Sequence, residues 1–261
     1  MSVVKFGPGG LGPVKDAVKN LEEFYGLGLR GCEVEFTYGP YIKSEEDAKI
    51  IGDKARELGI FLSVHAPYFV NLNSKEEEKV EASKKRILKC CEVASWLGAR
   101  RVIFHAGFYS GMSSEDAGSK IKEGIVEIMK VVEEKGWDVE LCPEVMGKVN
   151  VFGSIDEVSR LVEEAGCSFC IDVAHVLARY GKYEFEKIEK AFLGKKWHVH
   201  FSGIEYGEKG ERKHLLVEKK EWEEVLGWLD GLDKDVVLIC ESPDPVWDAV
   251  KGLGIWDKKK G

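Results

Sequence analysis

IFLSVH (60–65) and RVIFH (101–105) are two short apolar segments, and the longer segment between them includes KEEEKVEASKKRILKCCEVASWL (75–97). The short segments are rich in β-branched and aromatic residues, which is typical of buried strands. Apolar residues in the long segment recur every three or four positions, which indicates an amphipathic helix. A strand, a helix and a second strand in this order predict two parallel strands of one sheet.

The same alternation extends along the whole chain. Six further strands are predicted, at VVKF (3–6), CEVEF (32–36), VELCPE (139–144), SFCID (168–172), HVHFS (198–202) and VVLICE (236–241). Helical patterns lie over about 14–25, after Ser44, over about 114–135, from Ser154 to Ala165, over about 184–193, over about 219–231, and briefly from Pro245. Eight strand–helix units in 261 residues predict an α/β fold of the (β/α)8 TIM-barrel type, with residues 1–261 as a single domain.

An open, doubly wound sheet is the alternative architecture. It would need a glycine-rich phosphate-binding turn of the form G-x-G-x-x-G after its first strand. GPGGLGP (7–13) approaches that form, but two prolines interrupt it. The barrel is therefore the better interpretation, and a barrel carries its active site at the mouth formed by the carboxyl ends of its strands.

The composition excludes several classes of protein. The formal net charge of −8 excludes a protein that holds nucleic acid by overall positive charge, although it leaves room for a local basic rim. The sequence has no apolar run long enough to span a membrane and no hydrophobic signal core, so we expect a cytoplasmic protein without a membrane partner. The seven scattered cysteines, Cys167 and Cys170 among them, are expected to be small buried side chains.

Histidines and carboxylates gather at the predicted strand ends. His65 and His105 end two strands, and Glu144, Asp172 and Glu241 end three others. So many such groups at one mouth would repel one another and resist desolvation unless cations lie between them. Imidazole and carboxylate ligands suit Zn²⁺, Mn²⁺ or Fe²⁺, and their number predicts two or three ions. The other histidines are His175 just after a strand, His198 and His200 within a strand, and His214 in the loop that follows it.

Several of these residues lie in motifs that resemble the endonuclease IV family of apurinic/apyrimidinic endonucleases, which are xylose isomerase-like TIM barrels. HAPYFVNL (65–72) resembles the third-strand motif of that family, and IDVAH (171–175) resembles its Asp-x-x-His motif. His200, His214 and ESPD (241–244) continue the match in the family's order, over about residues 60–245. The resemblance implies a zinc-dependent DNA-repair hydrolase that cleaves the phosphodiester 5′ to abasic sites in duplex DNA through a metal-activated hydroxide.

The resemblance also implies a role for each matching residue. Two to three zinc ions are expected, with Mn²⁺ as a possible replacement, and Glu144 and Glu241 are the expected catalytic carboxylates. The implied ligands are His65 and His105 for a first ion, Asp172, His200 and Glu241 for a second, Glu144 as the bridge between these two, and His175 and His214 for a third. His198 is expected one layer deeper in the barrel, as core or as support for a ligand.

The sequence departs from the family at the third metal. The family has an Asp two residues before the second histidine, whereas this chain has Arg212 in ERKH (211–214). Either Glu211 replaces that ligand, or the third metal is weak or absent. By resemblance Tyr68 would stack against DNA at the abasic site, with packing inside its own loop as the alternative. Arg212 and Lys213 are expected to contact DNA phosphates.

Two other classes of function remain open. A sugar isomerase or epimerase of the xylose isomerase-like barrels would use one metal ion, and Glu144, Asp172, His200 and Glu241 satisfy that pattern too. Such an enzyme would also want a metal-free acid or base, for which Glu33 or Glu35 is available. The surplus of four histidines, His65, His105, His175 and His214, favours the nuclease. A barrel that binds metal without catalysis is the third possibility, and in every case we expect a monomer.

Overall fold

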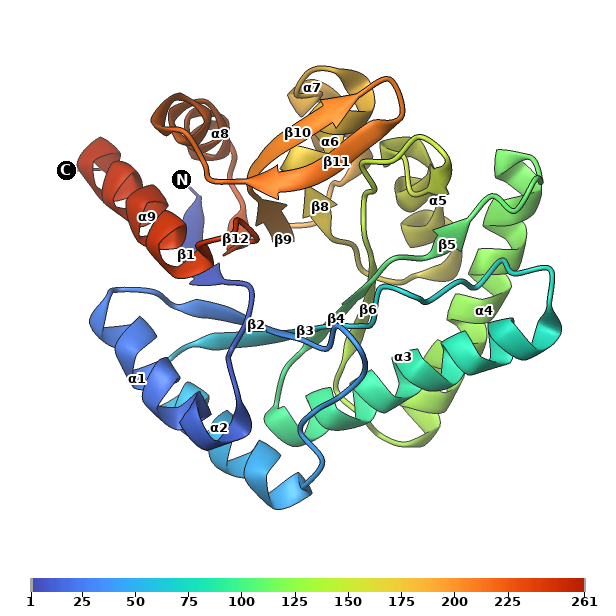
Figure 1. The fold of residues 1–261 in the computed structure, drawn as a ribbon, viewed down its shortest axis with the longest axis horizontal. Coiled ribbons are helices and arrows are strands. Elements are labelled where there is room, and N and C mark those ends of the chain that lie inside the picture. Colours follow the sequence, from blue (N-terminus) through green and yellow to red (C-terminus); the bar gives the residue numbers. More distant parts are fainter. Residues whose placement is uncertain (1, 261) are drawn as a thin grey trace.

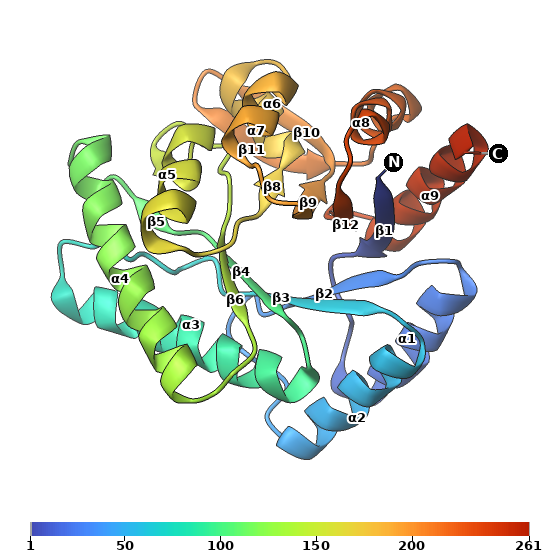
Figure 2. The same ribbon diagram turned by 180° about the vertical axis from the view of Figure 1, so that it is seen from behind.

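The computed structural model describes residues 2–260, and its centre is a ring of parallel strands surrounded by helices (Figures 1 and 2). The strands form two four-stranded sheets whose paired strands are all parallel. The first sheet has, in order, β2 (Gly31–Glu35), β3 (Phe61–His65), β4 (Arg101–Phe104) and β6 (Glu140–Pro143). The second has β8 (Ile171–Asp172), β9 (Lys196–Phe201), β12 (Asp235–Cys240) and β1 (Val3–Pro8).

Two seams close these sheets into a barrel. Parallel bridges join Gly9 to Glu33 at one seam and Glu144 to Cys170 at the other. The backbone N–H of Cys170 donates to the carbonyl of Pro143 at 3.1 Å across the second seam. The eight predicted strands are therefore confirmed, and with them the TIM-barrel fold class.

A glycine makes the first seam possible. A Cβ placed on Gly7 in β1 would lie 1.9 Å from the carbonyl oxygen of Gly31 in β2. No side chain can occupy that space, so β1 and β2 approach closely enough to close the barrel only because position 7 has none.

The predicted helices form with small shifts at their ends. Ser44 and Ser154 cap the helices that follow them, because each hydroxyl accepts a backbone N–H of the first turn. The helices are α1 (Ala17–Gly26, preceded by the 3₁₀ turn Val14–Asp16), α2 (Glu45–Glu57), α3 (Glu77–Leu97), α4 (Ser114–Glu134), α5 (Ile155–Ala165), α6 (Val173–Tyr180), α7 (Phe185–Ala191), α8 (Lys219–Gly231) and α9 (Pro245–Lys260).

The structure differs from the sequence-based expectation in three places. Helix α6 begins directly after β8, where no helix was predicted, because Asp172 caps it with its own side chain. The loop expected around His214 is an antiparallel hairpin of β10 (Gly203–Gly207) and β11 (Gly210–Leu215). Helix α9 continues to Lys260, so the expectation of only a brief helix from Pro245 was wrong, and Trp256 packs into the core. A small pair, β5 (Gly107–Phe108) and β7 (Val151–Phe152), also lies near the mouth.

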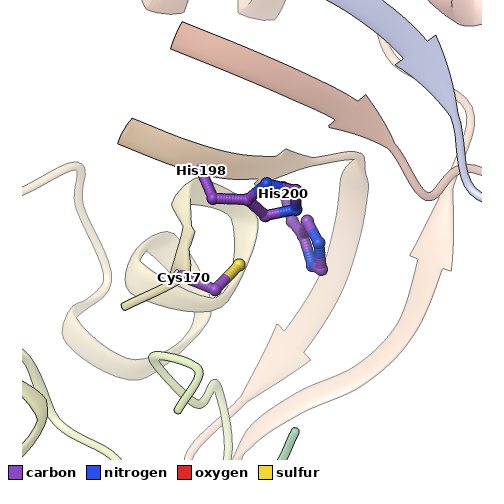
Figure 3. Close-up of side chains that lie close together, drawn as sticks. All are labelled: Cys170, His198 and His200. Carbon is purple, nitrogen blue, oxygen red and sulfur yellow. The ribbon is translucent and has the colours of Figure 1, made fainter. Parts of the chain in front are cut away.

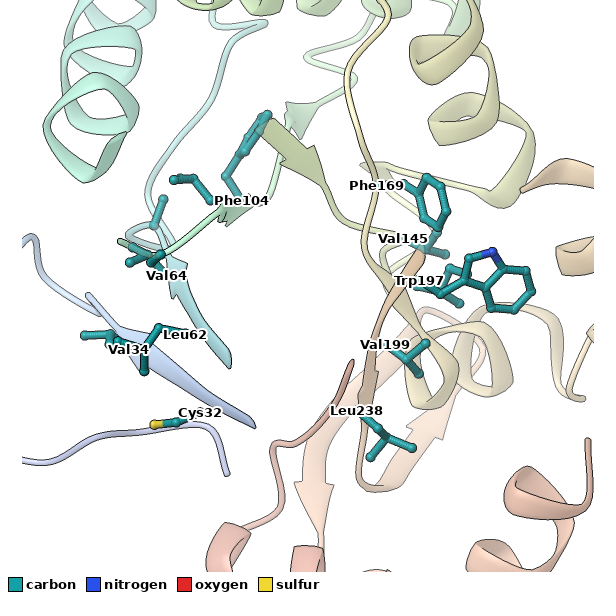
Figure 4. Close-up of a cluster of buried hydrophobic side chains, with 14 of the residues drawn as sticks. Cys32, Val34, Leu62, Val64, Phe104, Val145, Phe169, Trp197, Val199 and Leu238 are labelled. Carbon is teal, nitrogen blue, oxygen red and sulfur yellow. The ribbon is translucent and has the colours of Figure 1, made fainter. Parts of the chain in front are cut away.

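Alternate residues of each strand face opposite sides of the barrel wall. Val34 and Leu238 belong to the buried apolar cluster (Figure 4). Glu33, which precedes Val34 on β2, and its register partner Ser63 on β3 are polar, fully buried and hydrogen-bonded to each other inside the barrel. The barrel interior below the mouth is therefore polar, which is unusual for a packed core. None of the helices among residues 2–260 combines the length and apolarity of a membrane span.

Candidate metal centre

The structure brings all eight expected ligands together at the carboxyl ends of the barrel strands. Their ligand atoms form three groups, within each of which the atoms lie no more than 4.8 Å apart. The groups are His65, His105 and Glu144; Glu144, Asp172, His200 and Glu241; and Asp172, His175 and His214. Because Glu144 and Asp172 each belong to two groups, the three groups adjoin one another.

Glu144 directly follows β6 and lies between the first two groups. Its Oε2 is 3.1 Å from Nε2 of His65 and 3.1 Å from Nε2 of His105. Its Oε1 is 3.5 Å from Nδ1 of His200. Burial by itself raises the pKa of Glu144, but His105 and the other imidazoles outweigh it and hold that pKa well below its usual range. One carboxylate thus presents one oxygen to each group, as a bridge between two cations would.

The second group concentrates negative charge. Asp172 uses Oδ1 to accept the backbone N–H of His175 at 2.7 Å, while its buried Oδ2 has no hydrogen-bond partner among the described residues. Oε1 of Glu241 lies 3.2 Å from Nδ1 of His200. Burial, together with neighbouring carboxylates such as Glu144, raises the pKa of Glu241 to about 7. A cation in this group would stabilise the ionised form of all three carboxylates.

Glu211 lies beside the third group because of a β-bulge. In the β10–β11 hairpin, Glu205 pairs with Lys213 and Tyr206 pairs with Glu211, so Arg212 is an additional residue in β11. Oε2 of Glu211 lies 3.4 Å from Nε2 of His175. Nε2 of His214 also lies 3.4 Å from Nε2 of His175. His214 and Glu211 are three residues apart, so on a regular strand their side chains would face opposite sides. The bulge therefore brings Glu211 to the side of the hairpin that carries His214.

The ring orientations indicate which imidazole nitrogens are free to bind. Nδ1 of His65, of His175 and of His214 each lies 2.7–3.1 Å from a backbone carbonyl oxygen. A carbonyl only accepts, so each Nδ1 carries the proton and each neutral ring has its lone pair on Nε2. The carbonyl partners belong to Ala66, Val145 and Glu241.

These free nitrogens face other acceptors instead of donors. Nε2 of His175 faces Nε2 of His214, and Nε2 of His65 faces Glu144, so a positive charge is needed between them. In the metal-free protein, protons supply this positive charge. Burial alone would lower the pKa of His65 and of His175, but the surrounding carboxylates have the larger effect and raise both pKa values to about 10. Zinc fits the spacing too, because tetrahedral ligands at about 2.0–2.1 Å lie ~3.4 Å apart.

A second polar layer lies beneath the centre. Nε2 of His198 lies 2.9 Å from Oε2 of Glu33, and both side chains are fully buried. Burial lowers the pKa of His198 to about 4, so its ring is neutral. Figure 3 shows His198 and His200 beside Cys170. Burial also raises the pKa of Cys170 well above its usual value, so the thiol keeps its proton and is a poor metal ligand.

Glu33 and Glu35 occupy different depths. Both project from β2, and the ring of His200 contacts the deeper Glu33, with Nε2 2.9 Å from Oε1. Glu35 is the register partner of His65, and burial together with Glu33 and Glu144, against the opposing effect of His65 and His200, raises its pKa to about 7. The ligand motifs gave no role to Glu33. The available signal was a charge at an inward-facing position of a strand.

The mouth above the ligands opens into a cavity of about 380 Å³. Tyr68 and Phe108 line it together with His65, His105, His175, Glu211, His214 and Glu241. The Tyr68 ring centroid lies 5.7 Å from that of His65, and 53% of the residue is exposed, so Tyr68 borders the centre instead of packing inside its loop.

The two predicted DNA-contacting cations already have a partner. Nη1 of Arg212 lies 3.5 Å from Oε1 of Glu205, and Nζ of Lys213 lies 3.2 Å from Oε2 of the same carboxylate. Both side chains point to solvent, at 64% exposure each. Arg212 therefore turns away from the centre and is not a substitute ligand, and Glu205 offsets part of the charge that either cation would offer to DNA.

Comparison with known proteins finds related sequences. A family model described as a xylose isomerase-like TIM barrel matches residues 21–259. An uncharacterised protein of Methanocaldococcus jannaschii is 39% identical over 264 residues, with 94% of each chain covered. A probable endonuclease 4 of Mycobacterium marinum is 30% identical over 141 residues, and that match spans about half of each chain, 52%.

Solved structures share the fold at low sequence identity. Endonuclease IV from Thermus thermophilus superposes with a TM-score of 0.73 at 19% identity, covering 98% of this chain and 99% of that one. A D-psicose 3-epimerase from Clostridium cellulolyticum, crystallised with D-tagatose, superposes with a TM-score of 0.71 at 15% identity, covering 97% and 98%. Nuclease and epimerase barrels are thus about equally similar in fold, so the fold does not choose between them.

Proposed function

Since this chain belongs to the xylose isomerase-like TIM barrel family, which confirms the resemblance to its endonuclease IV members, we propose that it is a metal-dependent endonuclease. Its substrate would be duplex DNA with an abasic site, cleaved at the phosphodiester 5′ to the lesion. One observation carries the proposal: three ligand groups adjoin and share Glu144 and Asp172. Clustered divalent ions are a common device for phosphodiester hydrolysis.

The chain's own residues would divide the work at the mouth. Bound divalent ions would supply a nucleophilic hydroxide at neutral pH and offset the charge that develops on the phosphate. Glu144 would hold two cations at a fixed separation, and Glu241 would close the second group from β12. The cavity walls formed by Tyr68 and Phe108 would exclude water and pack against the base-less sugar. Glu211 would complete the third group in place of the family's aspartate.

A one-metal sugar isomerase or epimerase is the second candidate. The group of Glu144, Asp172, His200 and Glu241 by itself supports it, because it provides four ligands for a single ion. The fold similarity to an epimerase is also consistent with it. The first and third ligand groups would then have no role. In each of them, however, two atoms that accept hydrogen bonds face each other, so a positive charge is needed between them.

Metal stoichiometry and cleavage together test the proposal. Purified protein is expected to hold two to three equivalents of zinc or manganese by elemental analysis and to cleave a labelled duplex 5′ to a single abasic site. The same duplex with an intact base serves as the control. Chelation should stop cleavage. Cleavage should also weaken progressively as the pH is lowered, because protons compete with metal for His65 and His175, whose pKa in the metal-free protein is about 10. One equivalent of metal, no cleavage and turnover of a ketose would favour the isomerase and reject the nuclease.

A further inference from the structure

His200 is oriented differently from the other expected histidine ligands. Nδ1 of His65, of His175 and of His214 is held by a neutral backbone carbonyl, which leaves Nε2 for a metal. His200 has the opposite arrangement: its Nδ1 faces Glu241 at 3.2 Å, and its Nε2 lies 2.9 Å from a carboxylate oxygen of Glu33. Among these four rings, that of His200 has a carboxylate behind it and no backbone carbonyl. Nδ1 of His175 also faces carboxylate oxygens of Glu144 and Asp172, at 3.2 and 3.3 Å, but in addition to its carbonyl.

Glu33 is itself held firmly in place. The hydroxyl of Ser63 donates to Oε2 of Glu33 at 2.6 Å, and Nε2 of His198 lies 2.9 Å from the same oxygen. Glu33, Ser63 and His198 are all fully buried, and they come from β2, β3 and β9, so they span the barrel interior. With Oε2 fixed by these two donors, Oε1 faces Nε2 of His200 at an ion-pair distance of 2.9 Å, and neither atom has a hydrogen-bond partner among the described residues.

We propose that Glu33 is a positioning residue for the metal centre, and the proposal rests on that centre binding metal. Glu33 fixes the proton of His200 on Nε2, turns Nδ1 toward Glu144 and Glu241, and makes Nδ1 a stronger donor to a cation. Carboxylates behind ligating imidazoles have this effect in metalloproteins, and losing one typically weakens metal binding about 10–100-fold. Glu33 would act through His200 without touching substrate.

The burial of a charge here also argues for such a role. An ionised carboxylate in the interior is costly unless its partners compensate it, and an uncharged amide of the same size could also accept from Ser63 and His198. A negative charge at position 33 is needed only if this side chain must attract the ring proton of His200. The polar layer of Glu33, Ser63 and His198 would thus position the metal ligands that lie above it.

Zinc titration of the wild type, Glu33→Gln and Glu33→Asp against a competing chelator tests the proposal. Glu33→Gln keeps the size and removes the charge, and Glu33→Asp keeps the charge but draws it back from the ring. We expect Glu33→Gln to weaken zinc binding at the group of Asp172, His200 and Glu241 by about 10–100-fold, and Glu33→Asp by less. The third group, Asp172, His175 and His214, does not contain His200 and should lose less affinity, which provides a comparison within the same protein.

Nitrogen-15 NMR of the histidine rings gives a readout that does not depend on activity. In the zinc-loaded wild type, Nε2 of His200 should give the chemical shift of a protonated nitrogen and Nδ1 that of a metal-bound one. Glu33→Gln should move part of the population to the reverse assignment. Ser63→Ala is the matched control, because it removes a buried hydrogen bond to Glu33 and leaves the charge behind His200 in place. That variant should keep the tautomer.

The outcomes separate this proposal from the proposed function. An unchanged His200 tautomer together with unchanged zinc affinity in Glu33→Gln would overturn it. A parallel loss of affinity at all groups, with a lowered unfolding temperature, would show that Glu33 is only structural and would also overturn it. A wild type that binds zinc but does not cleave the abasic-site duplex would refute the proposed function alone, and the zinc titration and the tautomer measurement would still decide whether Glu33 orients His200. A wild type that binds no zinc would overturn both.

Discussion

Glu144 is the residue on which two of the three ligand groups depend, so its replacement gives the sharpest test of the centre. Glu144→Gln keeps the size but removes the charge shared by His65, His105 and His200. We expect cleavage of an abasic-site duplex to fall about a thousandfold or more. The unfolding temperature checks that the variant folds, and it should fall in the metal-free protein, because the imidazoles that hold the pKa of Glu144 well below its usual range stabilise its charge. Glu186→Gln, on an exposed glutamate of α7, is the control, and near-normal turnover by Glu144→Gln would exclude a shared centre.

The hairpin residues Glu211 and Arg212 allow a second comparison. Glu211→Gln should lower metal content by about one equivalent, because it removes a ligand of the third group. Arg212→Ala should leave metal content unchanged and flatten the salt dependence of DNA binding by about one unit of slope, provided Arg212 leaves Glu205 for a phosphate. Elemental analysis and binding at several salt concentrations measure both effects. If Arg212→Ala binds DNA like the wild type at every salt concentration, Arg212 contacts no phosphate and pairs only with Glu205.

The sequence predicts the residues of the site better than their arrangement. Strand-end positions alone predict that His65, His105, Glu144, Asp172 and Glu241 converge, because barrel topology brings the strand ends together. His175 and His214 were included because of the resemblance to endonuclease IV. The role of Glu211 could be offered only as an alternative, because it depends on a bulge at Arg212 that no residue type in ERKH announces. The contacts of Glu33 depend on which residues face each other across the barrel, and this requires the register of distant strands.

Elements with a repeated pattern were predictable, and elements that depend on a single contact were not. The eight strands and most helices follow from apolar periodicity and from caps such as Ser154. Helix α6 was missed because it begins at Val173, directly after Asp172 ends β8, which leaves no loop to signal the change. The hairpin was missed because GIEYG (203–207) and GERKH (210–214) are polar and lack the alternation of a half-buried strand.

Helix α5 offers a prediction about stability at this scale. Oε2 of Glu157 accepts the backbone N–H groups of Gly153 and Ser154 at 3.0 and 2.8 Å, and Oε1 accepts the hydroxyl of Tyr109 at 2.8 Å. Burial raises the pKa of Glu157, but these hydrogen bonds and that of Ser114 outweigh it and lower the pKa. We expect Glu157→Gln to lower the free energy of unfolding at pH 7 by about 1.5–3 kcal/mol.

The pH dependence follows from the direction of that shift. A depressed pKa in the folded state means that the stabilisation is fully present above the unfolded pKa, near 4.3, and is lost as the pH falls through the folded value. Urea unfolding should therefore show a difference between the wild type and Glu157→Gln that is largest at pH 7 and shrinks below about pH 4. Glu163→Gln, on the exposed face of the same helix, should show no such trend, and a constant difference across this range would contradict the assignment.

At the scale of the whole molecule, barrel closure depends on the seam between β1 and β2. Gly7→Ala would place a methyl group 1.9 Å from the carbonyl oxygen of Gly31, and only a shift of one strand can relieve that clash. We expect the free energy of unfolding to fall by roughly 1–3 kcal/mol or more, as measured by calorimetry. Gly231→Ala, where the added methyl meets nothing within 4 Å, is the control. That residues 1–261 form one domain stays a prediction, which a single unfolding transition in the same scans would support.

The two seams give the candidate centre a mechanical consequence. His65, His105 and Glu144 belong to one four-stranded sheet or follow it directly, whereas Asp172, His200 and Glu241 belong to or follow the other. Cations shared by Glu144 would therefore act as cross-links between two half-barrels that isolated bridges otherwise join.

Loading with metal should then slow deuterium uptake at seam amides such as Cys170 and leave amides in the middle of α4 unaffected. Equal protection throughout the chain would instead mean that metal stabilises the molecule as a whole. Removal of these cations by a chelator would then loosen the barrel wall at its seams as well as stop activity.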